Sequence, residues 1–160
     1  MDSPKRVSDS LTKHVEILMP SDMNGYERLF GGKLLQWIDV VAGVVARRHS
    51  GCEVTTASVD HLEFQAAAYV NETLVMEGRI TYVGRTSMEV RVDTFAEALD
   101  GTRRQVNRAY LVMVALDKDT HHPTPVPPLL VETEEERMEW EAAQRRRRER
   151  ALRKQQGGTV

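Results

Sequence analysis

The chain has 160 residues, of which 41% are hydrophobic and 29% are charged, a composition typical of one globular domain. Its net charge of −2 hides an asymmetry, because residues 145–154 carry seven Lys or Arg and one Glu, whereas the remainder carries 15 basic and 23 acidic residues. A basic tail on an acidic body argues against a nucleic-acid-binding domain whose whole surface is positive.

The cysteine count and the N-terminal residues indicate the compartment. Cys52 is the single cysteine, so no internal disulfide can form and nothing indicates an oxidising environment. Residues 1–12 are polar and lack the apolar core of a signal peptide, and no apolar stretch approaches the roughly 18 residues of a membrane span. We therefore expect a cytoplasmic protein whose residues 1–12 are disordered.

The main domain is expected over residues 13–130, beginning with a strand and a helix. The stretch "KHVEILMP" (13–20) alternates and predicts the strand, and the loop "SDMNGYERLFGG" follows it. A helix is predicted from Gly32 to about His49, with Gly51 as the residue that stops it. The helix is apolar nearly all round, so we expect it to be buried.

After this helix the hydrophobic period changes to two, which predicts strands. The predicted strands lie in "EVTTASVDHLEF" (53–64), "ETLVMEGRITYVG" (72–84), "TSMEVRVDTFAEAL" (86–99) and "NRAYLVMVALD" (107–117). In the third, Glu89, Arg91 and Asp93 alternate with apolar residues, so one face is expected to be wet. One long helix followed by antiparallel strands predicts an α+β fold, a five-stranded sheet folded over the helix.

Residues 131–160 are expected to form a charged C-terminal helix and tail. Thr133 and Glu136 have the spacing of a capping box, and acids fill the first turn while bases fill the last. The "RRRR" run at 145–148 is typical of a solvated helix end. Its alternative interpretations are attraction of an anionic nucleotide group or nonspecific attraction of RNA.

Asp39 is a single acid within the apolar part of the long helix. At about 100° per residue its face holds mostly small side chains, which leaves room for a ligand or for another backbone. Those neighbours are Gly32, Leu35, Ala42, Gly43 and Ala46. The pattern predicts a buried or half-buried carboxylate. The alternative is a structural acid, hydrogen-bonded to a backbone group or paired with Arg47 or Arg48 of a partner chain.

Four stretches together resemble one protein family. They are "MPSDMNGYERLFGGKLLQWIDVVAGVVARRH", "TASVDHLEF", "YVGRTSMEVRV" and "PVPPLLVET", and they are similar to the hotdog-fold acyl-CoA thioesterases of the cytosolic, broad-specificity type. The resemblance implies hydrolysis of acyl-CoA to a fatty acid and coenzyme A without metal or cofactor. It also implies a homodimer as the catalytic unit and a trimer of such dimers.

The resemblance assigns roles to particular residues. The catalytic carboxylate falls on Asp39 and the catalytic Asn on Asn24, while the Gly-Gly pair at the helix start falls on Gly31 and Gly32. The turn near the coenzyme A site falls on Gly84, Arg85, Thr86 and Ser87.

These assignments fit the chemistry of thioester hydrolysis. A carboxylate near water acts as a general base, and free N–H groups at a helix start stabilise an oxyanion. Asn24 orients the water or donates to the carbonyl. Asp39 lies about 10 Å along the helix axis from Gly32. We therefore expect a thioester held at Gly32 to be attacked by the Asp39 of a second subunit.

Other polar residues carry weaker signals. Cys52 has no obvious base nearby, His121 and His122 have no further ligand at metal-binding spacing, and Asp60 is only a minor candidate for a second catalytic acid. Two other functions stay open at this point. A hotdog hydratase or dehydratase uses a catalytic His near the helix, and a non-catalytic acyl-CoA-binding regulator would lack the helical acid.

Overall fold

The computed structural model of the protein describes residues 2–157. The elements in that range are β1 (Lys5–Arg6), α1 (Val7–Ser10), β2 (Thr12–Ile17), η1 (Pro20–Asp22), α2 (Gly31–Ser50), β3 (Glu53–Phe64), β4 (Thr73–Val83), β5 (Ser87–Glu97), β6 (Arg103–Leu116), β7 (Leu129–Leu130) and α3 (Glu134–Gln156). No helix within residues 2–157 has the length and apolar character needed to cross a membrane.

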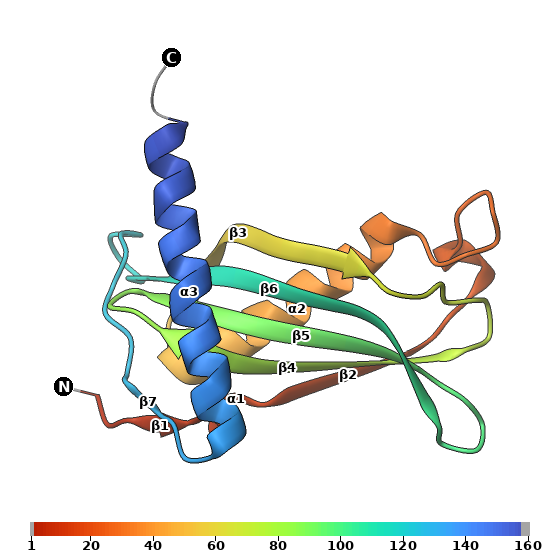
Figure 1. Ribbon diagram of the computed structural model, residues 1–160, viewed down its shortest axis with the longest axis horizontal. Coiled ribbons are helices and arrows are strands. Elements are labelled where there is room, and N and C mark those ends of the chain that lie inside the picture. The colour runs from red at the N-terminus through yellow and green to blue at the C-terminus, as the bar shows by residue number, and fades with distance from the viewer. Residues whose placement is uncertain (1, 158–160) are drawn as a thin grey trace.

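A five-stranded antiparallel sheet forms the centre of the molecule. Its strand order is β2-β4-β5-β6-β3, so β2 and β3 are the edges. The long helix α2 lies against one face and α3 crosses the other (Figure 1). The predicted α+β fold is confirmed, and β3 has the predicted bounds, although its pairing with β6 contains two register shifts.

Helix α2 packs one side of its surface onto the sheet. Leu34, Ile38 and Val45 are fully buried. The sheet approaches closely at Gly78 of β4, where a Cβ atom would lie 2.7 Å from Cγ1 of Val41. The helix ends at Gly51, which has a φ of 69° and donates its N–H to the carbonyl of Arg47 at 2.8 Å, as the sequence predicts.

The opposite side of α2 is open, which differs from the expectation of a helix buried nearly all round. Gln36, Asp39 and Val40 are exposed in the single chain, Val40 to 56%. The hydrophobic pattern identifies the apolar surface of the helix, but one sheet can bury only one side of it.

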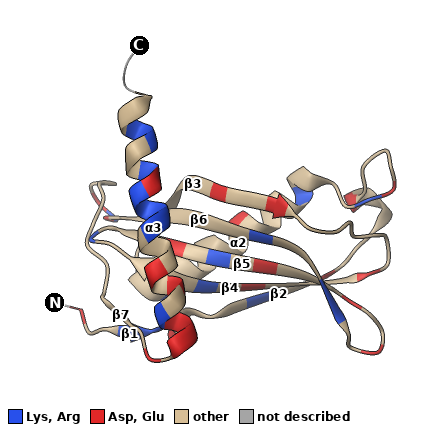
Figure 2. Ribbon diagram, viewed as in Figure 1, with Lys and Arg blue, Asp and Glu red and all other residues tan. Residues whose placement is uncertain are grey.

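The outer face of β5 is also not as predicted. Glu89, Arg91 and Asp93 were expected to be exposed to solvent, yet their exposed fractions are 2%, 8% and 2%, respectively. One reason is α3, which crosses this face (Figure 2) and pairs its Arg146 with Glu89 and its Glu139 with Arg91. Asp93 is paired within the sheet, with Arg91 and with Arg108 of β6. The capping box that begins α3 is formed as predicted, with the Glu136 N–H donating to Thr133 Oγ1 at 3.1 Å.

Residues 1–12 were expected to be disordered, whereas the structure contains β1, α1 and the start of β2 in this range. Strand β1 pairs in parallel with β7, and the Lys5 N–H donates to the carbonyl of Pro128 at 3.0 Å. Val7 and Ser10 are buried. Polar composition did not reveal this order because the partner, the Pro-rich segment before α3, is more than 100 residues away in sequence.

Candidate active site

The loop before α2 holds Asn24 in a fixed orientation. Its Oδ1 accepts hydrogen bonds from the N–H groups of Tyr26 at 2.9 Å and Arg28 at 3.2 Å. A bridge between Met23 and Leu29 closes the loop. The two bonds occupy the side-chain oxygen, and no hydrogen bond within residues 2–157 uses Nδ2. Asn24 therefore presents an amide donor to its surroundings.

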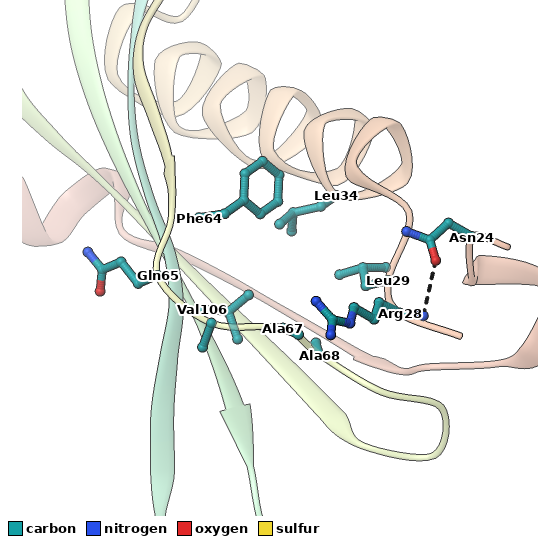
Figure 3. Close-up of a pocket in the computed structure, with 10 residues that line it drawn as sticks. Asn24, Arg28, Leu29, Leu34, Phe64, Gln65, Ala67, Ala68 and Val106 are labelled. Carbon is teal, nitrogen blue, oxygen red and sulfur yellow. Dashed lines mark hydrogen bonds between the residues drawn. The ribbon is translucent and has the colours of Figure 1, made fainter. Parts of the chain in front are cut away.

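Asn24 lies at the rim of a cavity of about 320 Å³ (Figure 3). Its lining consists mainly of apolar side chains from α2, β3, β6 and the loop after β3, with polar groups at the edge. The lining residues are Asn24, Arg28, Leu29, Leu34, Phe64, Gln65, Ala66, Ala67, Ala68 and Val106. A cavity with this mixture suits a ligand with an apolar chain and a polar end.

The first residues of α2 supply backbone donors close to the same region. The N–H groups of Lys33 and Leu34 bond to the carbonyl of Phe30, whereas those of Gly31 and Gly32 have no acceptor within the described residues. A Cβ atom at Gly32 would lie 2.7 Å from Cε1 of Phe30, so glycine permits the close approach of that ring. The positive end of the helix dipole and two free N–H groups favour a developing negative charge here.

Asp39 accepts a hydrogen bond from the hydroxyl of Thr56 on β3, with 2.6 Å between Oδ1 and Oγ1. Both residues line a second cavity of about 300 Å³. The prediction of a buried or half-buried carboxylate is wrong for the single chain, because Asp39 is exposed. Strand β3 is the sheet edge, so no further strand of residues 2–157 continues over this face of α2.

The turn from Gly84 to Ser87 joins β4 to β5. It is closed by the Gly84 N–H, which donates to the Ser87 carbonyl at 2.8 Å. The carbonyl of Thr86 accepts a hydrogen bond from the N–H of Ala115, and that of Arg85 accepts one from the N–H of Val126, both at 2.9 Å. These bonds fix the backbone, while the Arg85 side chain stays exposed.

A single chain does not bring the candidate residues together. Gly31 lies beside Phe64 at the end of β3, whereas the 84–87 turn lies beside the end of β6, at the opposite end of the sheet (Figure 1). Asn24 and Asp39 line different cavities. A site that uses Asn24, Asp39 and the 84–87 turn together needs more than one copy of the chain.

A hydratase or dehydratase would need a histidine on or near the long helix, and His49 lies in the last turn of α2. It is fully buried, and its Nε2 lies 2.8 Å from the carbonyl oxygen of Pro127. Burial lowers the pKa of His49 below its ordinary value. The ring lines neither candidate cavity, so its position gives no support to that alternative.

Comparison with known proteins identifies relatives of the chain. Residues 26–100 match the model of the Thioesterase superfamily. A Bacillus subtilis protein named as an uncharacterized acyl-CoA thioester hydrolase is 40% identical over 138 residues, which cover 86% of this chain and 80% of that protein.

Solved structures that resemble nearly the whole chain include two acyl-CoA hydrolases. One is an apo-hexameric acyl-CoA thioesterase, with a TM-score of 0.90, 36% identity and coverage of 99% of this chain and 100% of that one. The other is an acyl-CoA hydrolase of Staphylococcus aureus in complex with butyryl coenzyme A and coenzyme A, with a TM-score of 0.90, 30% identity and coverage of 96% and 93%. Structures of the latter protein also exist with Ala in place of one Asp, one Asn and one Thr.

Proposed function

Because the chain belongs to the family of hotdog-fold acyl-CoA thioester hydrolases, we propose that it hydrolyses fatty acyl-CoA to a free fatty acid and coenzyme A. The family resemblance predicted from the sequence is thereby confirmed. The observation that carries the proposal is the hydrogen bond between Thr56 and Asp39 at an open cavity. In support, the Asn, Asp and Thr replaced in the Staphylococcus aureus hydrolase have the same spacing along the chain as Asn24, Asp39 and Thr56.

In the proposed reaction Asp39 is the general base. The Thr56 hydroxyl occupies one carboxylate oxygen and fixes the plane of the group, so the other oxygen is directed at a water molecule. The water loses its proton to Asp39 as its oxygen attacks the thioester carbonyl carbon. When the carbon–sulfur bond breaks, the departing thiolate of coenzyme A takes that proton, which returns Asp39 to its carboxylate form.

The oxyanion that forms on the carbonyl oxygen needs donors placed before the reaction begins. The free N–H groups of Gly31 and Gly32 supply two, and Nδ2 of Asn24 supplies a third. The apolar cavity beside Asn24 holds the acyl chain. Arg85, with the other residues of the turn (Gly84, Thr86 and Ser87), binds the nucleotide half of coenzyme A, since an exposed guanidinium suits a phosphate.

Each active site belongs to two subunits in this proposal. One contributes Asn24 and the two glycines, and the other contributes Asp39 and Thr56, because within one chain Asn24 lines one cavity whereas Asp39 and Thr56 line another. The exposed side of α2 and the free edge of β3 form the seam of a homodimer. Three dimers would then form a hexamer, in line with the hexameric state of one structural relative. The absence of a cofactor and a cytoplasmic location stay predictions.

Incubation of the purified protein with acyl-CoAs of several chain lengths and a thiol reagent tests the proposal. Asp39→Asn and Asn24→Ala should each lower kcat by roughly 100-fold or more, the usual scale for a general base or an oxyanion donor. Asp119→Asn, in an exposed turn away from α2, is the control and should leave kcat unchanged. Normal turnover by a folded Asp39→Asn variant would contradict the mechanism, and a wild-type protein that hydrolyses no acyl-CoA would contradict the function.

A further inference from the structure

Helix α3 is fixed to the outer face of the sheet by buried ion pairs. Arg146 contacts Glu89 of β5 in a bidentate arrangement, with Nη2 at 2.7 Å from Oε1 and Nε at 3.1 Å from Oε2. One turn later, Arg150 pairs with Glu89 at 3.4 Å and also with Asp60 of β3. A bidentate guanidinium–carboxylate contact is directional, so these pairs fix both the position and the rotation of the helix.

This rotation directs Arg147 toward the turn between β4 and β5. Its Nη1 donates to the hydroxyl of Tyr82 at 2.8 Å, and its guanidinium carbon lies 5.5 Å from the centre of the Tyr82 ring. Its Nη2 lies 3.7 Å from the position that a Cβ atom would take at Gly84. Trp140, whose ring centre is 4.3 Å from that of Tyr82, supports the tyrosine from the preceding turns of α3.

Arg147 differs from Arg146 and Arg150 of α3, which are paired with carboxylates, in having no ion-pair partner among residues 2–157. It is also exposed. Its guanidinium is held by a neutral hydroxyl and an aromatic ring, which position the charge and leave it uncompensated.

The turn itself offers further donors next to this charge. The N–H groups of Arg85 and Thr86 have no acceptor within the described part of the chain, and the Arg85 side chain is exposed. Gly84 has no side chain, which leaves its surface open toward Arg147. Two guanidinium groups, one in the turn and one beside it, thus make a strongly positive place on a protein whose net charge is −2.

We propose that Arg147 is a substrate-binding residue contributed by the C-terminal helix, and that it binds a phosphate group in the nucleotide half of coenzyme A together with Arg85. This inference rests on the proposed function, because the 84–87 turn is the coenzyme A site there. It also divides the "RRRR" run by role. Arg146 anchors the helix by pairing with the buried Glu89, Arg147 binds the substrate, and Arg145 and Arg148 are exposed side chains.

Steady-state kinetics with three thioesters tests the assignment. The substrates are an acyl-CoA, the same acyl group on 3′-dephospho-coenzyme A, and the acyl-pantetheine thioester, which has no nucleotide. Arg147→Ala should raise KM for acyl-CoA by roughly 10- to 100-fold, the scale of one charge-assisted hydrogen bond, with kcat within about twofold of wild type. The pantetheine thioester should be unaffected, Arg147→Lys should restore part of the affinity, and Arg148→Ala should behave as wild type.

The dephospho substrate shows which phosphate is bound. If Arg147→Ala has no effect on that substrate, the 3′-phosphate is the ligand; if its effect persists, the pyrophosphate is, and both results support the proposal. An unchanged KM for acyl-CoA, or an equal rise for the pantetheine thioester, would overturn it.

Two further measurements separate this role from others. Tyr82→Phe removes the hydroxyl that Arg147 contacts but keeps the guanidinium, so a purely structural role predicts that both variants shift Trp140 fluorescence and weaken docking of α3. Calorimetric binding of coenzyme A itself separates the inference about Arg147 from the proposed hydrolase function. If the wild type hydrolyses acyl-CoA and the Arg147→Ala variant binds coenzyme A as tightly as the wild type does, only the inference about Arg147 is overturned. If the Arg147→Ala variant binds coenzyme A more weakly but the wild type hydrolyses no acyl-CoA, only the proposed function is overturned.

Discussion

Thr56 is the residue on which the orientation of Asp39 depends. Its hydroxyl donates the one hydrogen bond that the Asp39 carboxylate accepts within the described residues. Thr56→Val keeps the shape and removes the donor, so we expect kcat to fall by about tenfold or more, the value of a hydrogen bond to a charged group. Thr56→Ser should retain most of the activity. Equal rates for the Val and Ser variants would show that the hydroxyl has no part in turnover.

His49 makes the stability of the fold depend on pH. Burial lowers its pKa, so below about pH 6.5 the unfolded chain takes up a proton that the folded chain does not. The free energy of unfolding should therefore be at its full value above that pH and fall as the pH decreases through it. Urea titrations at several pH values should show a smaller decrease for His49→Gln than for the wild type. His122→Gln, in an exposed turn, serves as control and should follow the wild type.

The sequence predicted individual site residues better than their surroundings. Asn24 and Asp39 are recognisable because each has a distinctive place, one in a turn-rich loop and one within an apolar helix. Thr56 was missed because its role comes from a contact between a strand and a helix, although its place on the helix-facing side of β3 is a usable signal. The burial of Asp39 was predicted wrongly because periodicity shows apolar surface and does not show which chain covers it.

At the scale of elements, the main helix and the strands of the central sheet follow from the hydrophobic pattern. The failure at β5 has a definite physical cause. Alternating charges on a strand predict a wet face, but here Glu89 and Asp93 meet arginines brought by α3 and by β6. The i,i+4 spacing of Arg146 and Arg150 puts both on one side of the helix, facing Glu89. Such pairing between distant segments is not visible in either segment alone.

Glu89 should be the carboxylate on which docking of α3 depends most. Glu89→Gln leaves Arg146 buried without its charge partner, and we expect a loss of about 3 kcal/mol in the free energy of unfolding. Glu141→Gln removes an exposed partner of Arg137 and should cost less than about 0.5 kcal/mol. Chemical denaturation measures both. If the two variants lose equal stability, the buried pair does not hold the helix.

At the scale of the whole molecule, the exposed apolar surface indicates where a second copy binds. Val40, next to Asp39 on α2, and Val59 and Phe64 of the edge strand β3 are 56%, 41% and 51% exposed. A patch of this kind next to an unpaired strand edge is typical of a subunit interface. The same seam is where the two halves of the proposed active site have to meet.

Complementation between two inactive variants tests whether the site is shared. When Asp39→Ala and Asn24→Ala subunits exchange freely at equal concentration, half of the dimers are mixed, and one of the two sites in each mixed dimer regains both groups. Activity should therefore recover to about a quarter of the wild-type value, as the symmetry of a two-chain site requires. The matched control mixes Asp39→Ala with a variant that carries both substitutions, and this mixture should stay inactive because no subunit offers Asp39. Exchange is verified by mass spectrometry of differently tagged subunits. If proven exchange brings no recovery, Asn24 and Asp39 act within one chain or at different sites, and the two-subunit mechanism is wrong.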